Sequence, residues 1–173
     1  MIRVVLTGPE CSGKTTLSEA LAARFGAPWT PEAARRLAET GAAPLSAATV
    51  EPIARLSMAL EDDVAATGPA LLIRDTDLVS TIVYARHYYG AVPAWIEAEA
   101  RARRADLYLL CRPDLPWTPD GVRNRPVQRE ELFADFRAEL DAIGARVVEI
   151  SGEGESRTAR ATDAVTALLA GRP

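Results

Sequence analysis

Lysine, histidine and cysteine are scarce in this chain of 173 residues. It has one histidine, two cysteines and a single lysine, Lys14, while the other nineteen of its twenty lysine and arginine residues are arginine. Two cysteines are too few for a disulfide framework, and the lack of His/Cys clusters excludes a metal site built from those residues. The formal net charge of −4 argues against a nucleic-acid backbone as the main partner.

Long apolar runs are missing as well. No run reaches the roughly 20 residues that a transmembrane helix needs, and residues 2–6 have the pattern of a core strand rather than of a signal peptide. We therefore expect a cytoplasmic protein that has no membrane partner. The length suits one domain with a substantial core, so we expect a single domain over residues 1–173. Nothing in the sequence indicates an oligomeric state.

The single lysine lies in a phosphate-binding motif. Residues 8–15 read Gly-Pro-Glu-Cys-Ser-Gly-Lys-Thr, which fits G-x-x-x-x-G-K-[ST]. In such a loop the backbone N–H groups point at phosphate oxygens, the lysine reaches the β- and γ-phosphates, and the threonine hydroxyl ligates Mg²⁺. The wide fork of arginine is a poor substitute for this compact charge. The predicted nucleotide-binding residues here are Gly8, Glu10, Cys11, Ser12, Gly13, Lys14, Thr15 and Thr16, with Thr15 also a metal ligand.

The context of the motif is a strand followed by a helix. Residues 2–6 are β-prone, and residues 16–25 place Leu17, Leu21 and Phe25 on one helical face. The N-terminus of that helix adds its dipole to the anion site. We interpret Cys11 as a small neutral filler of the loop.

Strands alternate with helices along the whole chain. We predict strands at 2–6, 28–30, 70–73, 106–111 and 146–150, and helices at 16–25, about 31–40, 46–66, from Asp77 to 89, 93–104, 130–143 and 156–170. The strands are mostly apolar throughout, which is typical of a parallel sheet covered on both faces. We therefore expect an α/β protein with the three-layer P-loop nucleoside-kinase fold and a mostly parallel five-stranded sheet. Its ligands should bind at the carboxyl ends of the strands.

Two carboxylates follow the third predicted strand. Asp75 has the position of a Walker-B residue, which places a carboxylate near Mg²⁺ or lets it act as general base. Asp77 is a candidate substrate ligand. The alternative is a structural role, because aspartate is also favoured at a helix N-cap.

An irregular Pro- and Arg-rich stretch over residues 113–127 is predicted to be a lid. Arg123 is expected to be catalytic, Arg125 to bind the nucleotide, and Arg129 is a further candidate. The alternative is a solvated basic loop. Trp117 in this stretch and Trp29 are predicted to flank the acceptor cleft.

The predicted acceptor side includes Glu32 and Arg35, one helical turn apart. Their alternative is a surface ion pair. Tyr84, within a cluster of tyrosines around His87, could stack on a planar base. Core packing is its alternative, and we interpret His87 as a surface or capping residue. We expect contacts with adenine around residues 151–152.

Four segments together resemble a known family. The loop at 8–15, Glu-Ala-Ala-Arg at 32–35, Asp-Thr-Asp at 75–77 and Trp-Thr-Pro-Asp-Gly-Val-Arg at 117–123 occur in the same order in the kinase domain of NadR-type proteins. That domain is a nicotinamide-riboside (ribosylnicotinamide) kinase of the P-loop small-molecule kinase family.

The resemblance implies ATP and Mg²⁺ as phosphoryl donor and metal, and nicotinamide riboside as the acceptor that becomes the mononucleotide. It implies that Asp75 and Asp77 lie near the ribose and Mg²⁺, that Glu32 and Arg35 line the acceptor side, and that Arg123 belongs to the lid. Cys11 departs from the serine that is frequent in the family. The sequence has no DNA-binding helix-turn-helix segment and no nucleotidyl-transferase domain, so we expect neither a regulatory role at DNA nor an adenylylation activity.

Three alternatives stay open. One is a kinase of another nucleoside or nucleotide, since this fold hosts many chemistries. Another is a regulatory ATP-binding P-loop protein. A nucleic-acid end kinase is disfavoured by the acidic balance, and we expect a small nucleoside rather than a nucleic acid as partner.

Overall fold

The computed structural model describes residues 1–41, 45–116 and 128–171. Its five strands form one sheet in the order β2-β3-β1-β4-β5, and every neighbouring pair is parallel. The strands are β1 (Ile2–Thr7), β2 (Trp29–Thr30), β3 (Leu71–Asp75), β4 (Leu107–Cys111) and β5 (Val147–Ile150). The predicted parallel five-stranded sheet is therefore confirmed.

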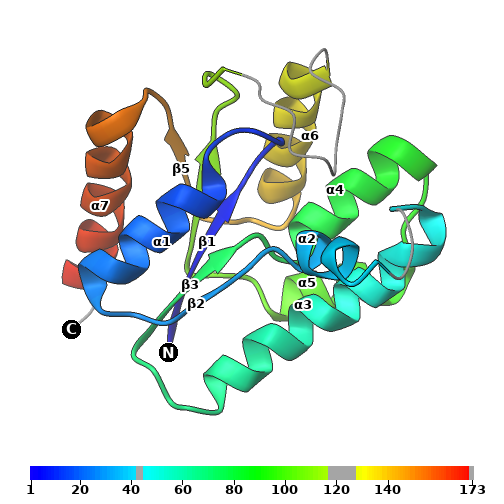
Figure 1. The fold of residues 1–173 in the computed structure, drawn as a ribbon, viewed down its shortest axis with the longest axis horizontal. Coiled ribbons are helices and arrows are strands. Elements are labelled where there is room, and N and C mark those ends of the chain that lie inside the picture. The colour runs from blue at the N-terminus through cyan, green and yellow to red at the C-terminus, as the bar shows by residue number, and fades with distance from the viewer. Residues whose placement is uncertain (42–44, 117–127, 172–173) are drawn as a thin grey trace.

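Helices cover both faces of this sheet, which gives the three layers predicted (Figure 1). They are α1 (Lys14–Phe25), α2 (Ala33–Glu39), the 3₁₀ helix η1 (Ala47–Thr49), α3 (Val50–Ala65), α4 (Leu78–Tyr89), α5 (Ala94–Ala102), α6 (Arg129–Ala142) and α7 (Gly154–Ala170). The helices α1 and α7 pack on one face, and α4 and α6 pack on the other. A third apolar cluster joins α3 and α5 to α4.

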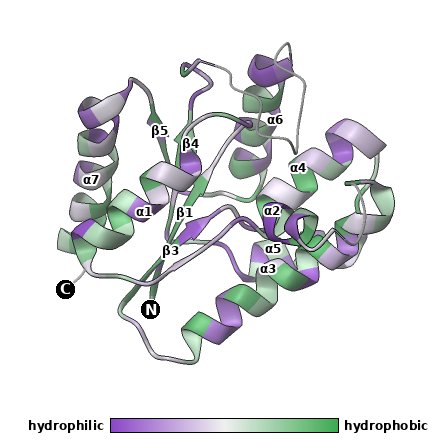
Figure 2. Cartoon of the chain, viewed as in Figure 1, coloured by the Kyte–Doolittle hydropathy of each residue, from purple (hydrophilic) through white to green (hydrophobic). Residues whose placement is uncertain are grey.

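The side chains of β4 show how the sequence divides the core. Leu107 and Leu109 pack with α1 and α7, whereas Tyr108 and Leu110 pack with α4 and α6. All four are fully buried, because a strand sends successive side chains to opposite faces. Figure 2 shows the central strands coloured mostly as hydrophobic, while α3 and α7 carry hydrophilic residues as well.

Most element boundaries differ from the predicted ones by one or two residues, and two of the differences involve helix caps. The predicted helix at 46–66 begins with η1, where Ser46 and Thr49 form a capping box, and turns α-helical only at Val50. The helix expected to open near residue 31 starts at Ala33, and Glu32 occupies its N-cap. Among the residues described, no helix is both long and apolar enough to cross a membrane.

A buried ion network fixes the end of β3. Arg74 Nη1 donates to Glu61 Oε2 at 2.8 Å, and Arg3 Nε donates to the other oxygen of Glu61 at 2.6 Å. Arg74 and Glu61 are 2 % and 1 % exposed. Because α3 is thereby tied to β1 and β3, the residue that follows Arg74 is held in a fixed place at the carboxyl edge of the sheet.

Candidate active site

The phosphate loop connects β1 to α1 and needs its glycines. Gly8 has a φ of 129°, and a Cβ there would lie 2.5 Å from the carbonyl oxygen of Cys111. Gly13 is left-handed at the N-cap of α1. Cys11 also has a positive φ, 52°, which is uncommon outside glycine. The loop thus curls in the way that the motif requires.

Lys14 is buried over this loop. It is 6 % exposed, and its Nζ donates to the carbonyl oxygen of Pro9 at 2.7 Å. The hydroxyl of Ser12 donates to the same oxygen at 2.8 Å. The ammonium group therefore lies inside the curl of the loop, where a β- or γ-phosphate would meet it.

Asp75 ends β3 beside Leu6 of β1, next to the phosphate loop. Thr15 Oγ1 donates to Asp75 Oδ2 at 2.5 Å. The other carboxylate oxygen, Oδ1, is buried and has no hydrogen-bond partner in the described parts of the chain. A threonine hydroxyl beside a carboxylate oxygen that lacks a partner is a donor set suited to Mg²⁺.

Burial raises the pKa of Asp75 from its ordinary 3.8 to about 6. The carboxylate of Glu32 adds to this rise, while Lys14 and the hydrogen bond from Thr15 oppose it. A buried carboxyl group is costly in its charged form unless a cation or donor compensates for the lost water. A cation at this position would relieve that cost.

Within the part of the chain that is described, no group of three or more His, Cys, Asp and Glu residues could hold a metal ion. Thr15 and Asp75 would therefore need a phosphate-bearing ligand to complete the coordination of Mg²⁺.

Asp77 has a different environment from Asp75. Its Oδ1 accepts from the backbone N–H of Val79 at 3.0 Å, so it caps α4, and its Oδ2 accepts from the hydroxyl of Tyr108 at 2.8 Å. Thr76 between the two aspartates has a φ of 68°, and this turn sends the two carboxylates to different surroundings. The capping alternative for Asp77 is confirmed, although the residue also lines the pocket described next.

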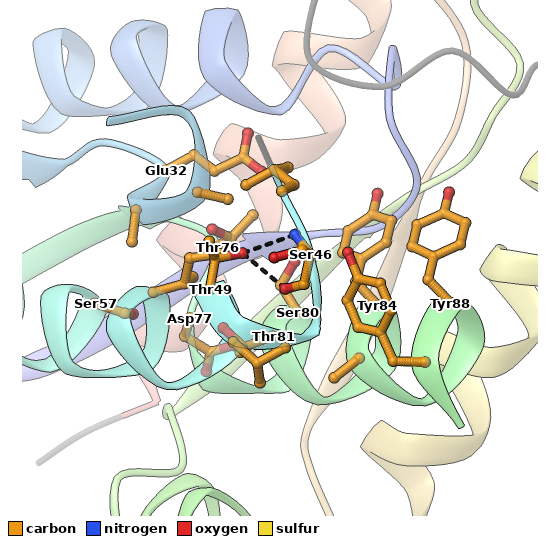
Figure 3. Close-up of a pocket in the computed structure, with 17 residues that line it drawn as sticks. Glu32, Ser46, Thr49, Ser57, Thr76, Asp77, Ser80, Thr81, Tyr84 and Tyr88 are labelled. Atoms are coloured by element: carbon orange, nitrogen blue, oxygen red, sulfur yellow. Dashed lines mark hydrogen bonds between the residues drawn. The ribbon is translucent and has the colours of Figure 1, made fainter. Parts of the chain in front are cut away.

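A pocket of about 320 Å³ lies beside Asp77, between α2, α3 and α4. Figure 3 shows Glu32 at one end of it and Tyr84 and Tyr88 from α4 at the other. Glu32 is 6 % exposed. Arg35 Nε lies 3.9 Å from a Glu32 oxygen, so the i,i+3 ion pair considered as the alternative is present. Glu32 lines the pocket, whereas Arg35 does not.

Tyr84 connects the pocket to the phosphate loop. Its hydroxyl donates to Glu10 Oε2 at 3.2 Å, and Glu10 is only 1 % exposed. Its ring stacks on Tyr88 with centroids 5.9 Å apart and packs edge-on against Phe136. Tyr84 is therefore both a pocket wall and a core residue. His87 Nδ1 instead lies 3.0 Å from Asp135 Oδ2, and because the His87 side chain is only 8 % exposed, its interpretation as a surface residue is wrong.

A second, larger groove of about 980 Å³ lies between α1 and α7, on the other side of the phosphate loop. Gly13, Thr16 and Leu17 line it from the loop and α1, and Gly154 and Arg157 line it from the start of α7. The predicted nucleotide residue Thr16 therefore faces a space that could hold a base. The residues expected near adenine, 151–152, directly precede Gly154.

Some predicted residues cannot be placed in this site. Trp117, Arg123 and Arg125 lie outside the described residues, as does the predicted lid after residue 116. Trp29 does not line the acceptor pocket. Its strand pairs with β3 at Ile73, and its ring packs against the core on the α1 side.

The chain was compared with known proteins and structures. The family model AAA_28, described as an AAA domain, matches residues 3–157. The chain belongs to this AAA domain family. No curated protein matches the sequence.

Among solved structures, a NadR protein in complex with NR superposes with a TM-score of 0.85 at 23 % identity, over 99 % of this chain and 51 % of that one. NadR in complex with NAD and AMP-PNP gives 0.79 at 23 % identity, over 99 % and 50 %. A thymidylate kinase from Ehrlichia chaffeensis gives 0.69 at 14 % identity, over 96 % and 98 %.

These likenesses show the fold. The chain spans about half the length of the NadR chains that it matches. The resemblance to the NadR-type kinase domain, predicted from four short segments, is confirmed at the level of the fold, and the thymidylate kinase shares the same three-layer arrangement.

Proposed function

We propose that the chain transfers the γ-phosphoryl group of ATP to a hydroxyl of a small nucleoside, with nicotinamide riboside as the preferred acceptor. The observation that carries this proposal is the position of Asp75. It accepts a hydrogen bond from Thr15 beside the phosphate loop. Burial raises its pKa, and the charge of Glu32, which lines the pocket, adds to the rise. Thr76 and Asp77, which follow Asp75 directly, also line the pocket. The carboxylate of Asp75 is therefore close to both the proposed donor site and the proposed acceptor pocket.

On the donor side, the triphosphate would lie along the loop, with Lys14 neutralising its terminal phosphates and the base in the groove beside Thr16. Thr15 and Asp75 would hold Mg²⁺, and a bound Mg²⁺ would neutralise part of the negative charge of the phosphates. We propose that the domain extends over residues 1–173, with 113–127 as a lid that brings Arg123 and Arg125 to the phosphates.

On the acceptor side, the stacked rings of Tyr84 and Tyr88 offer a flat wall for a planar base. Glu32 gives the pocket an acidic side chain, and none of the described residues that line it is lysine or arginine. This favours an acceptor with a neutral or cationic ring, as in nicotinamide riboside. It disfavours a nucleoside monophosphate, whose phosphate would need a cation in the pocket.

In the transfer, the oxygen of the acceptor hydroxyl forms a bond to the γ-phosphorus while the bond from that phosphorus to the β,γ-bridging oxygen breaks. The proton of the hydroxyl leaves to Asp75 or to solvent. With a pKa of about 6, Asp75 is mostly ionised at neutral pH and still basic enough to accept a proton. Asp75 serves either as this base or as the metal ligand, and both roles need its carboxylate.

The test is ADP release from Mg²⁺-ATP with nicotinamide riboside, common nucleosides, nucleoside monophosphates, a 5′-hydroxyl oligonucleotide, or no acceptor. Stimulation by nicotinamide riboside supports the proposal, and stimulation by another nucleoside keeps the chemistry but changes the substrate. ADP release that no acceptor changes would instead favour a regulatory ATP-binding protein. Lys14→Ala provides the inactive control, and Arg160→Ala, which removes one exposed positive charge on α7, should keep full activity.

A further inference from the structure

Two buried arginines hold consecutive carbonyl groups of the phosphate loop. Arg129 at the start of α6 donates from Nη2 to the carbonyl oxygen of Cys11 at 3.2 Å. Arg157 on α7 donates from Nη2 to the carbonyl oxygen of Ser12 at 2.7 Å. The two side chains come from different helices and are 8 % and 4 % exposed.

Arg157 also joins the phosphate loop to two neighbouring loops. Its Nη2 reaches the carbonyl oxygen of Arg112 at 3.1 Å, and its Nη1 reaches Asp114 Oδ1 and the carbonyl oxygen of Gly152, each at 2.7 Å. Asp114 in turn accepts from the N–H of Gly152 at 2.7 Å. One guanidinium therefore connects the phosphate loop to the segment after β4 and to the segment that leads into α7.

Arg129 makes fewer contacts. Besides Cys11, its Nη1 donates to the carbonyl oxygen of Leu115 at 3.0 Å, and it forms no ion pair with a described carboxylate. Its partners among the described residues are thus backbone oxygens, and burying a cation is costly for the fold. It does, however, raise the positive potential at an adjoining anion site, which offsets that cost once a phosphate is bound.

The planarity of the peptide bond links these contacts to the phosphate site. In a trans peptide the C=O of one residue and the N–H of the next point in opposite directions. Holding the carbonyl of Cys11 therefore fixes the N–H of Ser12, and holding the carbonyl of Ser12 fixes the N–H of Gly13. Each N–H points away from its arginine, and these are the kind of loop amides that contact phosphate oxygens.

We infer that Arg129 and Arg157 are positioning residues that orient the amides of Ser12 and Gly13 toward the phosphates of the bound nucleotide. This inference rests on the donor half of the proposed function and is independent of the acceptor. Both arginines act on the phosphates through the loop, and Arg157 also lines the groove proposed for the base. Because the same arginines also contact Leu115 and Gly152, the affinity of the loop for phosphate depends on the position of these two segments.

The test measures the affinity of Arg157→Ala and Arg129→Ala for three ligands that differ in phosphate content. Calorimetry gives the Kd for ATP and for inorganic triphosphate, and ligand-observed NMR gives that for adenosine. Since a lost hydrogen bond to a charged group changes affinity by roughly tenfold or more, both phosphate ligands should bind at least about tenfold more weakly. Adenosine should bind to Arg129→Ala as to the unmodified protein, and in Arg157→Ala, whose side chain lines the base groove, its loss of affinity should be smaller than that of either phosphate ligand.

Two exposed arginines on the same helices supply matched controls, Arg137→Ala on α6 and Arg160→Ala on α7. Both should retain the Kd for ATP. Arg157→Lys keeps the charge but cannot reach four acceptors at once, so it should keep the fold and still bind ATP weakly. An unchanged Kd for ATP in Arg157→Lys would show that the guanidinium group is not needed to orient the loop, and would overturn the inference.

Two further outcomes would overturn the inference. One is an ATP Kd within twofold of the unmodified value in both alanine variants. The other is an equal loss for ATP and adenosine, which indicates a general loss of structure. If the unmodified protein binds ATP but phosphorylates no acceptor in the panel, the proposed function fails while the inference about the loop is still tested by the Kd values.

Discussion

Asp75→Asn should make the folded protein more stable at neutral pH, although it removes a carboxylate that the proposed reaction needs. Asp75 is 1 % exposed, and burial raises its pKa from 3.8 to about 6. The folded protein therefore binds this proton more tightly than the unfolded chain. A group of this kind contributes stability that is fully present below its unfolded pKa and is lost as the pH rises through its folded pKa.

The size of the effect follows from the two pKa values. Between pH 3 and pH 8 the contribution falls by about 3 kcal/mol, since one pKa unit corresponds to about 1.4 kcal/mol. Between pH 5 and pH 8 about half of it, on the order of 1 kcal/mol, is lost. Asparagine has no charge to bury, so the stability of Asp75→Asn should not fall in this way. In a domain of this length, 1 kcal/mol corresponds to a shift in Tm of about 2–4 °C.

The assay is urea unfolding of the unmodified protein and of Asp75→Asn at pH 5 and pH 8, without nucleotide or Mg²⁺. The difference in unfolding free energy between the two proteins should move in favour of Asp75→Asn by about 1 kcal/mol at the higher pH. Asp63→Asn, an exposed change on α3, controls for the removal of one carboxylate. A stability difference for Asp75→Asn that is the same at both pH values would refute the raised pKa.

The other predictions concern the loop, the lid and the pocket. Lys14→Ala should abolish phosphoryl transfer while circular dichroism shows an intact fold, and activity near that of the unmodified protein would contradict the donor site. Gly8→Ala should lower Tm and abolish ATP binding, because its Cβ would lie 2.5 Å from the oxygen of Cys111. Arg123→Ala should lower kcat more than the affinity for ATP, and a pure loss of affinity would argue against a lid role. Tyr84→Phe should keep Tm within a few degrees but raise the KM for the acceptor, and an unchanged KM would place the Glu10 contact outside the acceptor site.

Local patterns were sufficient to predict the layers of the fold. Apolar strands such as residues 106–111 alternate with amphipathic helices, and this pattern permits only a few architectures. The motif at 8–15 and Asp75 both follow strands, so their meeting at one edge of a parallel sheet could also be predicted. The second strand was predicted at residues 28–30 and spans Trp29–Thr30, which is consistent with the missing N–H of Pro28.

The residues that sequence reasoning missed act through contacts between distant segments. Arg157 reaches Ser12 across 145 positions of the chain, and no spacing rule signals such a pair. The abundance of arginine also makes Arg157 hard to recognise, since nothing in the sequence distinguishes a buried arginine from the others of the nineteen. The division of roles between Asp75 and Asp77 depended on the positive φ of Thr76, which residue type alone does not predict.

The central claim is that phosphoryl transfer to a nucleoside hydroxyl depends on Asp75. The most direct measurement is the rate at which nicotinamide mononucleotide forms from nicotinamide riboside and Mg²⁺-ATP, followed by mass spectrometry for the unmodified protein and for Asp75→Asn. We predict product from the unmodified protein and a loss of about 100-fold or more in Asp75→Asn, the scale of a catalytic acid–base group. Equal rates in the two proteins, or no phosphorylated nucleoside from either, would contradict the claim.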